Sequence, residues 1–193
     1  MKKLLAVLAA LAVAVLAFAG CGSSDKQAAG ETKVLKVGAT AVPHAEVLEQ
    51  IKDDLKAQNI DLQIVEFNDY VQPNLALNDK ELDANYFQHA PYLENFIKEH
   101  PEVKVANAAG IHIEPMGIYS NKVKSLAEVQ DGASVAIPND PTNGGRALIL
   151  LSKAGLIKLK DDTNIASTVQ DVVENTKNLK SKEIIKDLII LNI

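Results

Sequence analysis

The sequence predicts an α/β fold with a largely parallel sheet, divided between two lobes. From Lys33 onward, short runs of β-prone residues alternate with runs whose apolar residues have helical spacing, a pattern typical of strand–helix–strand units. The chain has 193 residues, 47% of them hydrophobic, which is enough to bury a core in one domain or two small lobes. The formal net charge is −5 and the lysines are dispersed, so we expect no nucleic-acid-binding surface.

Residues 1–20 have the pattern of a secretory signal peptide. Two lysines precede an apolar run over 4–18, which is short for a membrane span of about 20 residues. Cys21 is the only cysteine, and its position after small residues resembles a lipoprotein lipobox. We expect removal of 1–20, attachment of lipid such as palmitate to Cys21, and a flexible tether over 21–32. A secreted protein with one free thiol is the alternative.

Residues 33–114 are expected to form the first lobe. A strand over 34–37 and a turn over 38–42 lead to a helix that begins at Pro43. One face of this helix is apolar, formed by Leu48, Ile51 and Leu55. Two further units follow in order: a strand over 62–67 with a helix capped by Asn68 and Asp69, and a short strand over 83–87 with a helix that ends before Pro101.

Residues 115–193 are expected to form the second lobe. The extended segment 111–119 is broken by Pro115 and Gly117, so we interpret it as a crossover between the lobes. Three signals then follow in order: a capping-box pattern at 125–128, a strand over 133–137, and a helix over 143–154 that ends at Gly155.

The turn and helix start at 137–148 are predicted to bind an anion. Arg146 is the only arginine in the chain, and a guanidinium matches a carboxylate or phosphate with two parallel hydrogen bonds. Gly144 and Gly145 would let a ligand approach the helix N-terminus closely. The spacing differs from that of a P-loop. A turn with a purely structural role is the alternative.

Aromatic residues are concentrated between positions 70 and 92, where Tyr70, Phe87 and Tyr92 suit a pocket for an alkyl or thioether group. Gln88 and His89 favour this interpretation, because a buried face seldom needs two such polar side chains. Ordinary core packing of a helix face is the alternative.

Neither metal binding nor catalysis is expected. The four histidines form no HxxxH or HxH pair, and the acidic residues are scattered. No serine stands in a nucleophile-elbow sequence, and no carboxylate pair stands out. We therefore expect no metal site, no cofactor and no enzymatic activity. The histidines are His44, His89, His100 and His112.

Four segments together resemble the NlpA family, the methionine-binding lipoproteins of ABC importers: 38–46, 83–89, 112–120 and 137–148. The resemblance implies a type II periplasmic-binding-protein fold, in which two lobes with mixed and parallel sheets close on an amino acid at the cleft between them. It also implies roles for individual residues. Tyr70, Phe87, His89 and Tyr92 would surround the methionine side chain, Arg146 would take the carboxylate, and Asn143 would contact the head group.

The resemblance implies a lipid-anchored receptor at the cell membrane, facing the periplasm or the cell exterior, that delivers L-methionine to permease and ATPase subunits. D-Methionine and related amino acids are further candidate ligands. A receptor for another small amino acid or a peptide is the alternative, and a metal-capturing lipoprotein or a surface adhesin would belong to a different class.

The resemblance extends to about residue 180, beyond which family members continue for several dozen residues. This chain instead ends with an atypical tail, 181–193. We expect an incomplete second lobe with exposed apolar surface and weakened ligand binding. The tail is predicted as an amphipathic helix with no evident place in the fold, its apolar residues being Ile184, Ile185, Leu188, Ile189 and Leu191.

Overall fold

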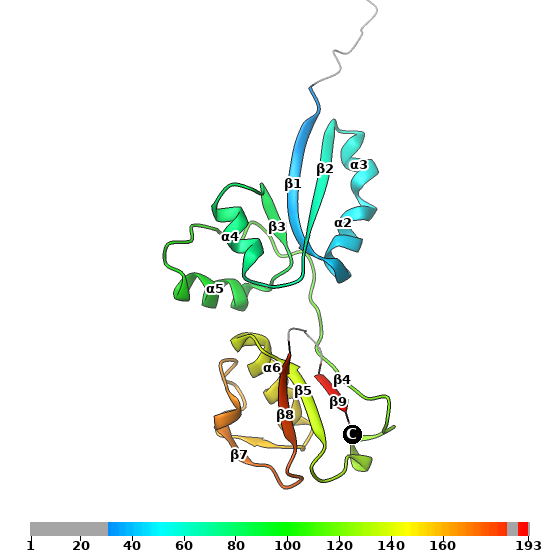
Figure 1. The fold of residues 1–193 in the computed structure, drawn as a ribbon, viewed down its shortest axis with the longest axis vertical. Helices are drawn as coiled ribbons and strands as arrows, with labels where there is room; N and C mark the ends of the chain where they lie inside the picture. The colour runs from blue at the N-terminus through cyan, green and yellow to red at the C-terminus, as the bar shows by residue number, and fades with distance from the viewer. Residues whose placement is uncertain (1–30, 185–188, 193) are drawn as a thin grey trace, which may run out of the picture.

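The computed structural model describes residues 31–184 and 189–192, whose strands form a three-stranded, a four-stranded and a two-stranded sheet. Figure 1 shows the two larger sheets in separate parts of the molecule, joined by an extended crossover. Both contain parallel strand pairs, which confirms the predicted α/β class. The predicted signal peptide and Cys21 lie outside the described residues. Within the described ranges, no helix is long and apolar enough to cross a membrane.

The three-stranded sheet is parallel and has the order β2-β1-β3. Its strands are β1 (Lys33–Thr40), β2 (Ile60–Phe67) and β3 (Ala84–Tyr86). The turn predicted over 38–42 is wrong in part, because pairing with β2 continues as far as Thr40 opposite Phe67. Gly38 lies inside β1, where an added Cβ would stand 2.6 Å from the side chain of Leu82.

The helix that follows β1 agrees with the predicted spacing except at Ile51, and the helix that follows β2 begins after Tyr70. A π-helical turn, η1 (Ala41–Ala45), leads into α2 (Glu46–Gln50) and α3 (Lys52–Lys56). The backbone leaves helical geometry at Ile51, so this side chain is 41% exposed instead of joining Leu48 in the core. After β2, the carboxylate of Asp69 accepts hydrogen bonds from two backbone N–H groups at the start of α4 (Gln72–Asn78).

The last helix before the crossover is α5 (Ala90–Glu99), which buries one apolar face. That face consists of Tyr92, Leu93 and Phe96. Figure 1 places α5 at the end of the first part that lies nearest the second part.

The four-stranded sheet is mixed, with the order β4-β9-β5-β8. Its strands are β4 (Ile118–Tyr119), β5 (Ser134–Pro138), β8 (Lys180–Ile184) and β9 (Ile189–Asn192). Strand β9 pairs parallel with β4 and antiparallel with β5, while β8 pairs parallel with β5. The two-stranded sheet joins β6 (Lys158–Leu159) to β7 (Val172–Glu174), which follows the short helix η3 (Val169–Asp171).

The predicted amphipathic helix in the tail is wrong, since 180–184 and 189–192 are strands. Isoleucine is β-branched and suits a strand, and the neighbouring strands supply backbone partners that a sequence pattern does not display. Strand β9 lies between β4 and β5, so this part of the tail has a definite place in the sheet. Ile185 and Leu188 lie outside the described residues.

Helix α6 (Pro141–Lys153) packs on this second sheet and buries Ala147, Leu148 and Leu151. It begins two residues before the predicted start, because Asp140 is its N-cap and accepts a hydrogen bond from the N–H of Asn143. Its end before Gly155, which has φ = 71°, agrees with the prediction. The capping-box pattern at 125–128 starts only one short 3₁₀ turn, η2 (Leu126–Glu128).

Gly145 is required for packing within this second part of the molecule. A Cβ at this position would overlap the backbone carbonyl oxygen of Ile165. The loop at 165–167 therefore covers the face of α6 that the sequence analysis left open for a ligand. Gly144 has less room than an exposed glycine too, since its Cβ would lie 3.0 Å from the carbonyl oxygen of Pro138.

We expect Gly145→Ala to lower the free energy of unfolding by about 1–3 kcal/mol or more, because the loop must move away from α6. Urea denaturation followed by circular dichroism measures the change. Gly110→Ala is the matched control, since an added Cβ there meets nothing within 4 Å. Equal denaturation midpoints for the two variants would show that the loop at 165–167 can move away from α6 without lowering the free energy of unfolding.

Candidate functional site

Three of the predicted aromatic residues form one cluster. The ring centroids of Tyr70 and Phe87 are 6.1 Å apart, and Tyr92 lies 6.0 Å from Tyr70 and 6.1 Å from Phe87. Phe87 and Tyr92 are each only 8% exposed. The hydroxyl of Tyr92 donates to the backbone carbonyl of Tyr70 at 2.9 Å, which fixes the ring. Burial, aided by the charge of Asp140, raises the pKa of Tyr92, so its hydroxyl remains a donor at neutral pH.

A cavity of about 250 Å³ lies beside this cluster and is lined from both parts of the molecule. Tyr70 and Tyr92 line it on one side, and the turn before α6 lines it on the other through Asn139, Asp140 and Pro141. Phe87 does not line the cavity, but its ring packs against those of the two tyrosines. A larger cavity of about 480 Å³ lies against β5 and β8, away from every predicted site residue.

His89 is the N-cap residue of α5, and its Nε2 atom is buried without a hydrogen-bond partner. Burial lowers the pKa of His89, and the positive charge of Arg146 lowers it further. The imidazole is therefore neutral at physiological pH. A buried polar atom without a protein partner is rare in folded proteins, and Nε2 of His89 is therefore available to form a hydrogen bond with a ligand.

Arg146 and Asn143 form a pair near the start of α6. One guanidinium nitrogen of Arg146 donates to Oδ1 of Asn143 at 2.7 Å, and another donates to the backbone carbonyl of Glu114 at 3.0 Å. These two contacts hold the half-buried guanidinium in place and leave further N–H donors for a ligand. The carbonyl of Glu114 comes from the crossover, so Arg146 also ties the crossover to the second part.

Asp140 is a polar residue of the cavity that the sequence analysis did not select. One carboxylate oxygen accepts hydrogen bonds from the hydroxyl of Thr142 and the N–H of Asn143, both at 2.9 Å. The other oxygen, Oδ2, is buried without a partner. Among the described residues, only His89 Nε2 and this atom are buried side-chain atoms in that state. Aspartate directly before a proline at a helix start was the available signal.

Gln88, by contrast, has a structural role. Its amide exchanges hydrogen bonds with the fully buried Asn74, at 2.9 and 2.7 Å, and donates to Asn85. Asn85 in turn donates to Asn74 at 3.0 Å. These three amides, one each from α4, β3 and the residues after β3, thus satisfy one another, so Gln88 is no sign of a ligand pocket.

Five of the six predicted site residues therefore fall into two groups. Tyr70, Phe87 and Tyr92 touch one another in the first part, and Asn143 and Arg146 touch each other in the second. His89 belongs to the first part by sequence and interacts electrostatically with the second group, because the charge of Arg146 lowers its pKa. Only Tyr70 and Tyr92 line the 250 Å³ cavity directly.

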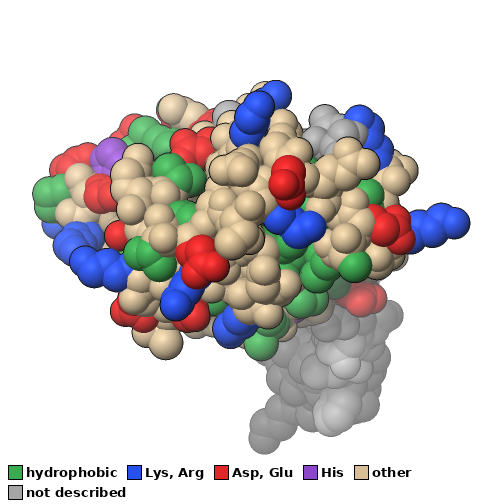
Figure 2. Space-filling view, turned by 90° about the horizontal axis from the view of Figure 1, so that it is seen from below, with side chains coloured by type: hydrophobic (Ala, Val, Ile, Leu, Met, Phe, Trp, Pro, Cys, Tyr) green, Lys and Arg blue, Asp and Glu red, His purple; other side chains and the backbone are tan. Residues whose placement is uncertain are grey.

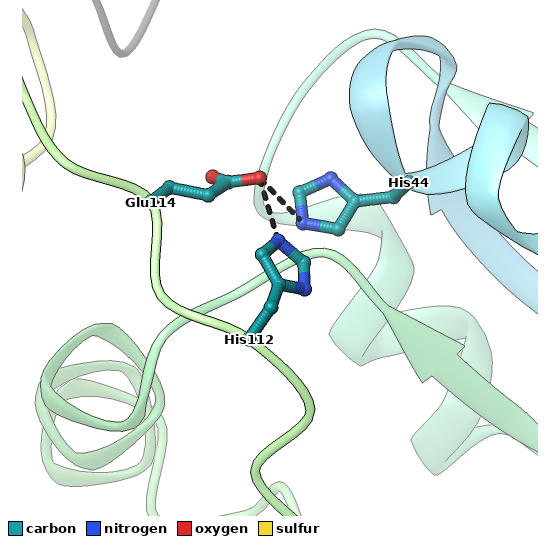
Figure 3. Close-up of side chains that lie close together, drawn as sticks. All are labelled: His44, His112 and Glu114. Carbon is teal, nitrogen blue, oxygen red and sulfur yellow. Dashed lines mark hydrogen bonds and ion pairs between the residues drawn. The ribbon is translucent and has the colours of Figure 1, made fainter.

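A second polar cluster was not anticipated at all. Figure 3 shows the side chains of His44, His112 and Glu114 converging on one point. The Nε2 atoms of His112 and His44 lie 2.9 and 3.5 Å from the same carboxylate oxygen of Glu114. His44 follows β1, whereas the other two lie on the crossover, so no local spacing could reveal the group. Burial lowers the pKa of His44, although the charge of Glu114 opposes this effect.

The surface beyond these clusters carries charges of both signs. Figure 2, which looks onto the molecule from below, shows lysine and acidic side chains interspersed over this face. Such a mixture produces only small local potentials on this face and suits a solvated surface.

Comparison with known proteins identifies the relatives of this chain. A family model described as NlpA lipoprotein matches residues 35–187. The chain is 41% identical to the methionine-binding lipoprotein MetQ of Bacillus subtilis, over 97% of its own length and 68% of that protein. It is 46% identical to the D-methionine-binding lipoprotein MetQ of Escherichia coli K12, over 88% of its own length and 61% of that protein.

Solved structures agree with these relatives. The crystal structure of a methionine-binding protein, MetQ, superposes with a TM-score of 0.74 at 47% identity, covering 78% of this chain and 62% of that one. A putative lipoprotein from Ruminococcus gnavus gives a TM-score of 0.75 at 43% identity, covering 82% and 70%. The chain spans about two thirds of the length of the curated relatives. It belongs to the NlpA lipoprotein family.

Proposed function

We propose that this protein is the substrate-binding component of a methionine ABC importer and has no catalytic activity of its own. Cys21 would anchor it to the cell membrane by lipid, facing the periplasm or the cell exterior, where it would pass L-methionine to permease and ATPase subunits. The family and the printed names of the relatives support this proposal. D-Methionine is a second candidate ligand, because the Escherichia coli relative is named for it.

The observation that carries the proposal is the pairing of an aromatic cavity with unsatisfied polar atoms of suitable kinds. An amino acid at neutral pH has an ammonium group, a carboxylate and a side chain. The free oxygen of Asp140 suits the ammonium, and the remaining donors of Arg146 suit the carboxylate. The rings of Tyr70 and Tyr92 suit a thioether, since sulfur–aromatic contacts contribute about 0.3–1.5 kcal/mol each.

The site residues come from both parts of the chain, which supports a division into two ligand-binding lobes at 33–114 and 115–193. Tyr70, Phe87, His89 and Tyr92 would be contributed by the first lobe, and Asn143 and Arg146 by the second. Asp140 would join the second group. A ligand that touches both lobes favours the closed arrangement over the open one, and the importer would recognise the closed arrangement.

Isothermal titration calorimetry on the full chain in detergent, with EDTA present, tests the proposal. We expect L-methionine to bind at one site per chain with a dissociation constant in the micromolar range, in keeping with the weakened binding expected from the sequence. Norleucine, which replaces the sulfur by a methylene, should bind more weakly because it loses the sulfur–aromatic contacts. Tight binding of a different amino acid or a peptide, with no heat from either methionine isomer, would replace the ligand. No binding of any amino acid would favour an adhesin.

A further inference from the structure

The cluster of His44, His112 and Glu114 has the composition and the spacing of a transition-metal site. Their ligand atoms all lie within 4.8 Å of one another. In a tetrahedral zinc site with bonds of about 2.0–2.1 Å, neighbouring ligand atoms are roughly 3.3 Å apart. The distances from Glu114 Oε1 to His112 Nε2 and His44 Nε2, 2.9 and 3.5 Å, bracket this value. Two of the three separations between ligand atoms are therefore close to those of a zinc site, and the third is within 4.8 Å.

Both imidazoles are held by a hydroxyl on the side opposite Glu114. Nδ1 of His44 lies 2.6 Å from the hydroxyl of Thr40, and Nδ1 of His112 lies 2.6 Å from the hydroxyl of Tyr86. In metal sites, the outer ring nitrogen of a histidine ligand almost always donates to an acceptor such as a carboxylate, a backbone carbonyl or water, which directs the inner nitrogen at the metal. A hydroxyl oxygen can accept from that nitrogen in the same way. Here both outer nitrogens are engaged and both Nε2 atoms point at the same oxygen, as Figure 3 shows.

Charge and access also suit a cation. Within the described part of the chain, the ion pairs of the Glu114 carboxylate involve only the two histidines, not a lysine or an arginine. The side chain of His44 is 6% exposed, whereas those of His112 and Glu114 are 34% and 38% exposed. An ion could thus enter from the side of the crossover and complete its coordination with water.

We propose that His44, His112 and Glu114 form a structural binding site for one divalent transition-metal ion, with Zn²⁺ as the best match to two imidazoles and one carboxylate. The ion would fasten the crossover, which carries His112 and Glu114, to the turn that follows β1. It differs from the proposed methionine site in every ligand residue. It would also be a fixed component of the protein rather than a transported cargo.

Zinc titration of the full chain, stripped with EDTA and exchanged into chelator-free buffer, tests the proposal. A competing chromophoric chelator should report one Zn²⁺ per chain with a dissociation constant in the micromolar range or below. At a free zinc concentration 100-fold above that constant, the melting temperature should rise by about 5–10 °C. Co²⁺ in place of Zn²⁺ should give the visible absorption of a tetrahedral nitrogen and oxygen site.

Variants separate this site from adventitious surface binding. His112→Gln should weaken zinc binding at least tenfold, and Tyr86→Phe, which removes only the supporting hydroxyl, by about 10- to 100-fold. His100→Gln is the matched control, because His100 also lies beside a carboxylate, Glu102 at 3.3 Å, and its loss should leave the affinity unchanged. The proposal is wrong if no zinc binds, or if His112→Gln and His100→Gln bind it as tightly as the unaltered chain. Neither outcome bears on methionine binding, which is measured with EDTA present.

Discussion

Arg146→Ala is expected to weaken L-methionine binding by about ten- to a hundredfold, because hydrogen bonds to a charged group contribute about 1.5–3 kcal/mol. The guanidinium is already oriented by Asn143 and by the carbonyl of Glu114, so little ordering remains when a carboxylate arrives. Arg146→Lys should recover only part of the affinity, since an ammonium cannot form two parallel hydrogen bonds. Calorimetry on the full chain measures both values.

Lys153→Ala is the matched control for Arg146, because it removes a positive charge from the last turn of the same helix, at an exposed position. This variant should retain the affinity of the unaltered chain. Thermal unfolding of each variant should accompany the calorimetry, since loss of the contact between Arg146 and Glu114 also frees the crossover. Unchanged affinity in both Arg146 variants would remove this residue from the site.

Asp140→Asn is expected to weaken methionine binding by a similar factor while leaving the fold intact. Asparagine is as good an N-cap as aspartate, so the hydrogen bond from the N–H of Asn143 can persist. The free oxygen, however, becomes an NH₂ group that repels a ligand ammonium instead of accepting from it. Calorimetry and the denaturation midpoint together separate the two effects.

A methionine analogue that lacks the amino group supplies the control for this prediction. The desamino compound should bind the unaltered chain weakly, and Asp140→Asn should cost it little further affinity. If Asp140→Asn lowers the affinity for methionine and for the desamino analogue by the same factor, the carboxylate does not contact the ammonium. In that case Asp140 serves only as the cap of α6.

The parts of the fold that follow from local chemistry could be predicted from the sequence. The end of α6 before Gly155 and the hydrogen bonds that Asp69 accepts just before α4 depend on residues a few positions apart, and the end of α6 occurs as expected. The N-cap residue of α4 is Val71 and not Asp69. The tail could not be predicted in this way, because its isoleucines suit a helix face and a strand alike. Partners in β4 and β5 decide between these states, and they lie far away along the chain.

The candidate site divides along the same line. Residue type alone was enough to predict two parts of the site. Arg146 is the only arginine of the chain, and aromatic residues are concentrated between positions 70 and 92. The prediction that Gln88 belongs to a ligand pocket is wrong, because its hydrogen-bond partners, Asn74 and Asn85, become its neighbours only after folding. The unpartnered oxygen of Asp140 could not be predicted from the sequence, because it depends on which carboxylate oxygen accepts hydrogen bonds after folding.

Glu114 contacts two different sites, one through its backbone and the other through its side chain. Its carbonyl accepts from Arg146, and its carboxylate faces His44 and His112. Any displacement of Glu114 would therefore change both the contact with Arg146 and the contacts with the two histidines. Thermodynamic reciprocity then requires that, if zinc changes the affinity for methionine by some factor, methionine changes the affinity for zinc by the same factor. Glu114 is the residue through which such a coupling between the proposed metal site and the proposed ligand site would pass.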